Sequence, residues 1–125
     1  RATNYTGNGM RIVWEDESHF FLNVGNSDWS PSTNPVLYAQ DLNHDAGKIH
    51  KLKEDGSIPA DNPVFDNFTR PSTIWSYGHR DVQGLYFEKS TNTLYGIEHG
   101  PKGGDEFNII EKGQNYGRPL KKVLI

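Results

Sequence analysis

The turn residues that interrupt every apolar run limit most strongly what this chain can fold into. No stretch of the 125 residues repeats apolar side chains at the three- and four-residue spacing of an amphipathic helix. Short runs rich in β-branched and aromatic residues alternate instead with clusters of glycine, proline, asparagine and aspartate. This pattern predicts an all-β chain and leaves a sandwich, a barrel and a propeller open.

Seven runs predict strands, and four of these strands form two hairpins. The hairpins share one plan, an aromatic-rich strand, an acidic turn and a second strand, which allows one repeat unit each with long inserted loops. We expect Trp14 and Trp75 to lie in the core rather than in a site. The predicted strands are residues 10–14 and 19–24 (first hairpin), 47–52, 74–79, 84–87 and 93–97 (second hairpin), and 107–110.

Composition excludes several classes of protein and site. Hydrophobic residues make up 34% of the chain, which predicts a thin core for this length. The net charge of −3 favours no nucleic-acid partner, and the absence of cysteine excludes disulfides and thiolate metal sites. No apolar run is long enough to span a membrane, and no signal peptide is visible. Because the chain begins at Arg1, we expect a processed chain or a piece of a longer protein.

One stretch, residues 75–119, holds most of the unusual chemistry. The basic cluster 77–80 (YGHR) is followed by Asp81 and Gln83, and residues 98–106 (EHGPKGGDE) place acids, a histidine and three glycines in nine positions. This segment has too much glycine and charge for a buried strand. Loops of this kind, held between short strands, are where binding and catalytic sites are usually built.

Residues 41–47 offer a different candidate, a calcium loop of the D-x-N-x-D type. Asp41, Asn43 and Asp45 supply oxygen ligands, but Ala46 stands where such a loop needs glycine and Leu52 where it needs glutamate. The alternative interpretation is an Asx turn before a strand. An unrelated all-β calcium-binding domain therefore remains a third hypothesis for the whole chain.

Several blocks of the sequence resemble one family, in its order and at its spacings. Residues 77–85 (YGHRDVQGL) resemble the family motif Y-G-H-R-N-P-Q-G-L, and 98–106 resemble E-H-G-P-x-G-G-D-E. Residues 115–119 (NYGRP) resemble N-Y-G-W-P, while 47–49 and 55–63 match G-K-I and D-G-S-I-P-A-D-N-P. The chain resembles the glucose/sorbosone dehydrogenases, the soluble aldose sugar dehydrogenases that depend on pyrroloquinoline quinone (PQQ).

The resemblance implies a six-bladed β-propeller that binds PQQ with a calcium ion and oxidises an aldose at C1 to its lactone. At four strands a blade, this chain would supply roughly two to three blades, so residues 1–125 would form a single partial propeller domain. An unclosed propeller leaves apolar faces exposed, and we expect a homo-oligomer or a completing chain to cover them. The resemblance also implies a periplasmic or secreted protein.

The resemblance assigns five residues to the site. Arg80 matches the arginine at the quinone and would be the catalytic residue, with an ordinary surface ion pair as its alternative. Gln83 matches a cofactor-facing amide, or caps a loop. Asp81 stands where the family has asparagine, and an ionised carboxylate accepts hydrogen bonds but cannot donate them. Gly100 and Pro101 match the pair whose carbonyl oxygens hold calcium, or form a plain turn. His79 and His99 are interpreted as scaffold residues.

The sequence departs from the family pattern at its N-terminal end. Aligning residues 9–12 (GMRI) to the family's G-G-R-L segment places Gly7 where the catalytic histidine stands, and Asn26 where a family aspartate stands. The general base would therefore be missing. The resemblance also implies that the half of the cofactor rim supplied by the family's later blades would be missing from residues 1–125. Two hypotheses stand beside the calcium-binding domain: a truncated or degenerate member of the aldose dehydrogenases, and a non-catalytic propeller-like binding module that self-associates.

Overall fold

In the part of the chain that the structure describes, seven strands form where the apolar runs predict them. The structure, a computed structural model, describes residues 10–25, 39–79, 82–98 and 106–117. In order, the strands are β1 (Met10–Trp14), β2 (His19–Val24), β3 (Lys48–Lys53), β4 (Ile74–Tyr77), β5 (Val82–Glu88), β6 (Thr93–Glu98) and β7 (Glu106–Ile110).

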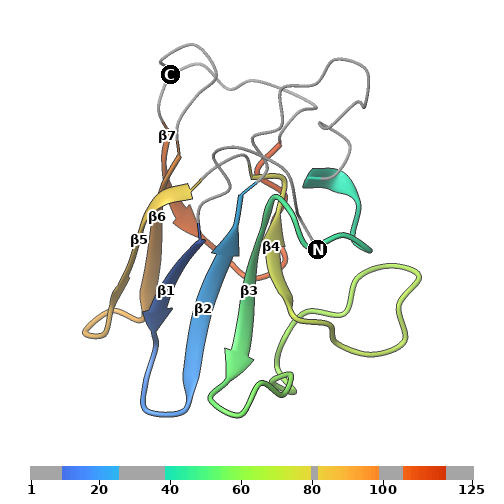
Figure 1. Ribbon diagram of the computed structural model, residues 1–125, viewed down its shortest axis with the longest axis horizontal. Coiled ribbons are helices and arrows are strands. Elements are labelled where there is room, and N and C mark those ends of the chain that lie inside the picture. Colours follow the sequence, from blue (N-terminus) through green and yellow to red (C-terminus); the bar gives the residue numbers. More distant parts are fainter. Residues whose placement is uncertain (1–9, 26–38, 80–81, 99–105, 118–125) are drawn as a thin grey trace.

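The strands form two antiparallel sheets, each opened by one of the predicted hairpins. The first sheet has the order β1-β2-β3-β4, and the second has the order β5-β6-β7 (Figure 1). Neighbouring strands are also neighbours in sequence, so each sheet is a simple meander. The prediction of strands at residues 74–79 was too long, because Gly78 has a φ of 79°, which an extended strand cannot contain.

The core lies between the inner faces of the two sheets. Alternation along β2 turns Phe21 inward from the first sheet, where its ring centroid lies 6.0 Å from that of Phe87 on β5. Asn23 on the same face accepts a hydrogen bond from Arg11 N (2.7 Å) and donates one to Val82 O (3.2 Å). Among the described residues, the buried hydrophobic cluster consists of Phe21, Ile49, Val82, Phe87, Leu94 and Ile110.

The buried cation Lys51 lies at the edge of this core, between Trp75 and the β1–β2 turn. Lys51 is only 4% exposed, and its Nζ lies 4.6 Å from the ring centroid of Trp75 and 3.1 Å from Glu15 Oε1. Trp75 therefore packs on the core, as predicted. The same prediction for Trp14 was wrong, because Trp14 is 47% exposed on the outer face of β1, where it contacts Phe20.

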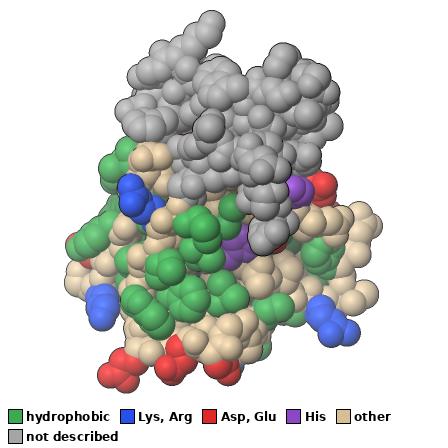
Figure 2. Space-filling model, viewed as in Figure 1, with side chains coloured by type: hydrophobic (Ala, Val, Ile, Leu, Met, Phe, Trp, Pro, Cys, Tyr) green, Lys and Arg blue, Asp and Glu red, His purple; other side chains and the backbone are tan. Residues whose placement is uncertain are grey.

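Both outer faces of the two-sheet stack carry exposed apolar side chains. On β1, alternate residues Met10, Ile12 and Trp14 point away from the second sheet. On the second sheet, Tyr86, Tyr95 and Phe107 stack across three strands with centroid separations of 6.3 and 5.5 Å, and Phe107 is 66% exposed. Figure 2 shows apolar side chains grouped on one face of the molecule. Within the described residues, no helix has the length and apolar character needed to cross a membrane.

Candidate functional site

The motif blocks converge at one end of the two sheets. Strand pairing places Lys48, at the start of β3, opposite Tyr77 at the end of β4, and it places Val82 opposite Glu98. β4, β6 and the 113–117 segment therefore all deliver motif residues to this end (Figure 1). We call six of these residues the strand-end cluster: Gly47, Tyr77, Gly78, His79, Glu98 and Tyr116.

A buried hydrogen-bond relay joins the two sheets within this cluster. His79 Nδ1 lies 2.7 Å from Glu98 Oε2, and His79 Nε2 lies 2.9 Å from Ser76 Oγ. The three residues are 1%, 5% and 0% exposed. In the neutral ring, Nδ1–H donates to the Glu98 carboxylate and Nε2 accepts from the Ser76 hydroxyl. The relay fixes the end of β4 beside the end of β6, and it confirms His79 as a scaffold residue.

Two glycines let the backbone approach closely around this relay. Gly78 donates its N–H to Ala39 O (3.0 Å), and a Cβ built on it would lie 2.8 Å from Gly117 N and would meet the Asn115 side chain. Gly47 accepts a hydrogen bond from His79 N (3.0 Å), and a Cβ there would lie 2.7 Å from Ala39 Cα. Both glycines have positive φ, so the motif needs glycine for its conformation and for its space.

Tyr116 completes the cluster by packing on the histidine ring. Its ring stacks on that of His79 with a centroid distance of 4.8 Å and an interplanar angle of 21°. Its hydroxyl donates to Ile109 O (2.8 Å) and accepts from Glu111 N (2.7 Å), and its backbone N–H donates to Tyr77 O (2.8 Å). Burial raises the pKa of the Tyr116 hydroxyl, which therefore stays protonated.

The structure describes one of the five predicted site residues, Gln83. The register passes from Val82 to Gly84 against β6, so Gln83 is the extra residue of a β-bulge. Its carbonyl oxygen accepts a hydrogen bond from Arg11 Nε (2.8 Å). Bulges commonly re-aim a side chain next to a site.

The other four predicted site residues, Arg80, Asp81, Gly100 and Pro101, lie outside the described residues. The structure does describe the residues that directly precede their segments in the sequence. His79 directly precedes Arg80, and Glu98 precedes the 99–105 segment by one residue. The 2.7 Å bond between His79 and Glu98 therefore joins the two described residues that precede these segments. Gly7 and Asn26 also lie outside the described residues.

The second candidate, residues 41–47, has the contacts of an Asx turn. Asp41 Oδ1 accepts a hydrogen bond from Asn43 N (2.9 Å), and Asp41 O accepts one from His44 N (3.0 Å). Behind the turn, Lys48 is buried and donates to Ala46 O (2.8 Å). Burial lowers the pKa of Lys48 to about 8. The segment is thus an Asx turn that precedes β3, as its alternative interpretation predicted.

Glu15, Asp16 and His19 place three possible metal-ligand atoms within 4.8 Å of one another in the described part of the chain. Asp16 Oδ1 already accepts a hydrogen bond from Ser18 N (2.8 Å) and lies 3.1 Å from His19 Nδ1, and these contacts lower the pKa of Asp16 to about 2. The Lys51 ammonium lies 3.1 Å from Glu15. These contacts stabilise the β1–β2 turn, and the adjacent cation opposes a metal ion.

Comparison with known proteins agrees with the fold and with the motif cluster. A family model described as Glucose / Sorbosone dehydrogenase matches residues 1–123, and the chain belongs to that family. It is 42% identical over 117 residues to the aldose sugar dehydrogenase YliI of Escherichia coli, covering 92% of this chain and 30% of that protein. It is 40% identical over 99 residues to quinoprotein glucose dehydrogenase B of Acinetobacter calcoaceticus, covering 79% of this chain and 20% of that protein.

Solved structures give the same result at the level of the backbone. The soluble aldose sugar dehydrogenase from Escherichia coli in its apo-form matches with a TM-score of 0.77 and 39% identity, covering 94% of this chain and 33% of that one. The PQQ-bound aldose sugar dehydrogenase from Streptomyces coelicolor matches with a TM-score of 0.75 and 32% identity, covering 92% and 31%. The chain spans a third or less of the length of these relatives.

These findings confirm the family resemblance and the prediction of an all-β chain built from propeller blades. The described residues make one four-stranded sheet and three strands of a second. The sequence did not reveal the relay, although His79 and Glu98 each directly precede a predicted site segment. Their positions beside those segments were the one available signal.

Proposed function

We propose that this chain is the part of a PQQ- and calcium-dependent aldose sugar dehydrogenase that holds the quinone and the calcium ion. Arg80, Asp81 and Gln83 would face the cofactor, and the carbonyl oxygens of Gly100 and Pro101 would bind calcium. The buried His79–Glu98 bond is the observation that supports this proposal most strongly, because it joins the two residues that precede these segments in the sequence. The Streptomyces coelicolor structure, which is PQQ-bound by its own description, supports the cofactor.

The residue types of the two segments fit the proposed cofactor and ion. Calcium takes oxygen ligands, and carbonyl oxygens from a glycine-rich turn can surround it without side chains. A guanidinium binds carboxylate and quinone oxygens through several fixed donors and keeps its charge at any working pH. Gly47 and Gly78 leave no room for a Cβ, so the backbone of the strand-end cluster is closely packed at both positions.

PQQ, when bound, would accept a hydride from C1 of the aldose. Arg80 would stabilise the negative charge that this transfer places on a quinone oxygen. Asp81 would weaken that stabilisation, because an ionised carboxylate repels negative charge where asparagine could donate a hydrogen bond. Gly7 supplies no imidazole at the position of the general base, so we expect slow turnover from this chain.

An aldose is the proposed substrate, since two relatives are named for aldose sugar and glucose dehydrogenation. The family resemblance also supports a periplasmic or secreted location. To test the function, PQQ and calcium are added to the chain, then an aldose, and quinone reduction is followed by absorbance. Arg80→Gln should abolish reduction, while the exposed control Lys89→Gln should not change it. Equal reduction by Arg80→Gln would refute the role of Arg80.

The exposed outer faces favour a second candidate, a non-catalytic module that self-associates. Trp14 on β1 and Phe107 on β7 lie on opposite outer faces of the sheet stack, and both are 47% exposed or more. Two such faces on one molecule support head-to-tail association. Sedimentation should then give a mass that rises with concentration, and Phe107→Lys should lower it. A compact monomer at every concentration would exclude this candidate.

A further inference from the structure

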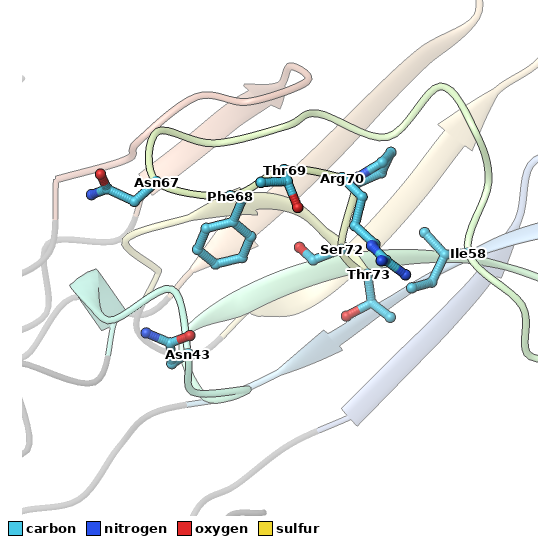
Figure 3. Close-up of a pocket in the computed structure, with 9 residues that line it drawn as sticks. Asn43, Ile58, Asn67, Phe68, Thr69, Arg70, Ser72 and Thr73 are labelled. Atoms are coloured by element: carbon cyan, nitrogen blue, oxygen red, sulfur yellow. The ribbon is translucent and has the colours of Figure 1, made fainter.

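An open groove runs beside the loop that leads into β4. It encloses about 550 Å³, within the range of small-molecule sites. None of the residues of the strand-end cluster lines it, so it is a separate feature of the molecule. Polar residues and apolar surface both line it, with one aromatic ring (Figure 3): Asn43, Ile58, Asn67, Phe68, Thr69, Arg70, Pro71, Ser72 and Thr73.

Ser72 and Thr73 form the floor of the groove, and hydrogen bonds with buried polar side chains hold both residues in place. The buried Asn62 side chain donates to Ser72 O (2.9 Å) and to Lys51 O (3.0 Å), so it ties the loop to β3. Thr73 Oγ1 lies 2.8 Å from Nδ1 of the buried His50. A ligand would therefore meet a floor that is already ordered, which lowers the entropic cost of binding.

A tight turn positions Phe68, the aromatic residue of the groove. Phe68 N donates to Phe65 O (3.0 Å), and Asn67 inside this turn has a φ of 73°. The Phe68 ring packs edge-on against Phe65 at 6.4 Å, and Phe65 packs in turn against Tyr77 at 5.5 Å. In Figure 3, Phe68 points from the loop toward Asn43. The left-handed Asn67 sets the direction in which the ring points.

The charge of the groove is opposite to that of the chain. The chain has 16 acidic and 13 basic residues, yet none of the described residues that line the groove is acidic, and Arg70 is basic. Arg70 is exposed and points toward Ile58 and Thr73 (Figure 3). Asp66, the acid nearest to Arg70 in sequence, and Asp41 and Asp45, which flank Asn43, are exposed and outside the lining. The groove therefore suits a ligand with one negative charge.

We propose that this groove binds an acidic saccharide, one that carries a uronate carboxylate. The C–H face of a sugar ring would pack on Phe68, and its hydroxyls would bond to the Asn43 amide and the Thr69 hydroxyl. The carboxylate would pair with the Arg70 guanidinium in a two-pronged bond. The site shares no residue with the proposed cofactor site, so this inference does not rest on the proposed function.

The test is an NMR titration of the chain with digalacturonate and with its dimethyl ester, a neutral probe of nearly the same shape. The acid should shift the amide signals of residues 67–70, 72 and 73 in a saturable way, and the ester should bind at least about tenfold more weakly. Arg70→Gln should remove the preference for the acid, and Arg70→Lys should restore part of it. Phe68→Leu should weaken both probes.

Lys89→Gln is the matched control, since it removes an exposed positive charge from the β5–β6 turn of the other sheet. It should leave both affinities unchanged. Unchanged signals elsewhere in each variant's spectrum show that it is folded. The proposal is overturned if no saturable shift occurs, if acid and ester bind equally, or if Lys89→Gln weakens binding as much as Arg70→Gln does.

Discussion

Replacing His79 by phenylalanine tests the joint between the two sheets. Phenylalanine keeps the ring that stacks on Tyr116, but it removes the 2.7 Å bond to Glu98 and the 2.9 Å bond to Ser76. A buried hydrogen bond to a carboxylate contributes about 2 kcal/mol and one to a hydroxyl about 1 kcal/mol. We therefore expect His79→Phe to lower the free energy of unfolding by about 3 kcal/mol.

Urea unfolding, followed by tryptophan fluorescence and by circular dichroism, gives this free energy. Ser76→Ala alone should cost about 1 kcal/mol, and in the His79→Phe background it should cost less, because its partner is already gone. His19→Phe is the matched control, since His19 makes a 3.1 Å contact to Asp16 at the surface, and its effect should be much smaller. Equal losses for His79→Phe and His19→Phe, or strictly additive losses at positions 76 and 79, would refute the relay.

Three further predictions concern other parts of the site. Gly78→Ala should destabilise the chain by about 2 kcal/mol or more, whereas Gly56→Ala, which has positive φ but nothing within 4 Å of its Cβ, should cost only about 1 kcal/mol. Equal losses in urea unfolding would contradict the close approach to Gly117. Lys48 has a folded pKa of about 8 against an ordinary 10.5, so the unfolded chain binds more protons between these values. Stability should rise by about 3 kcal/mol from pH 8 to 10.5 and stay low below pH 8, and Lys48→Met should flatten this rise. Parallel pH profiles would contradict the burial effect. Asp81→Asn should speed quinone reduction by an aldose, and an unchanged or lower rate would contradict the charge argument.

Periodicity and turn residues predicted the strands well because each strand depends on local alternation. The runs at 10–14 and 19–24 became β1 and β2, with the acidic turn between them. Local pattern could not show which faces would be covered. Trp14 is a large apolar residue of the kind that usually lies in a core, but its position in the strand points it outward, away from the second sheet.

The relay could not be predicted because it joins residues from different sheets. His79 and Glu98 are 19 residues apart and become partners only when β4 and β6 end side by side. The two cluster glycines were easier to recognise from the sequence than the relay, since Gly47 and Gly78 both belong to motif blocks. Both have positive φ in the structure. Their close contacts with Ala39 and Gly117 depend on the folded arrangement, which no spacing rule supplies.

The central claim is that the two segments joined by His79 and Glu98 form one site for PQQ and calcium. Equilibrium titration of the chain with PQQ, with calcium and then with a chelator, measures this directly through the cofactor absorbance. We predict saturable binding that requires calcium, and weaker binding by His79→Phe at a temperature where that variant is still folded. Absence of binding, or binding that neither calcium removal nor His79→Phe changes, would contradict the claim.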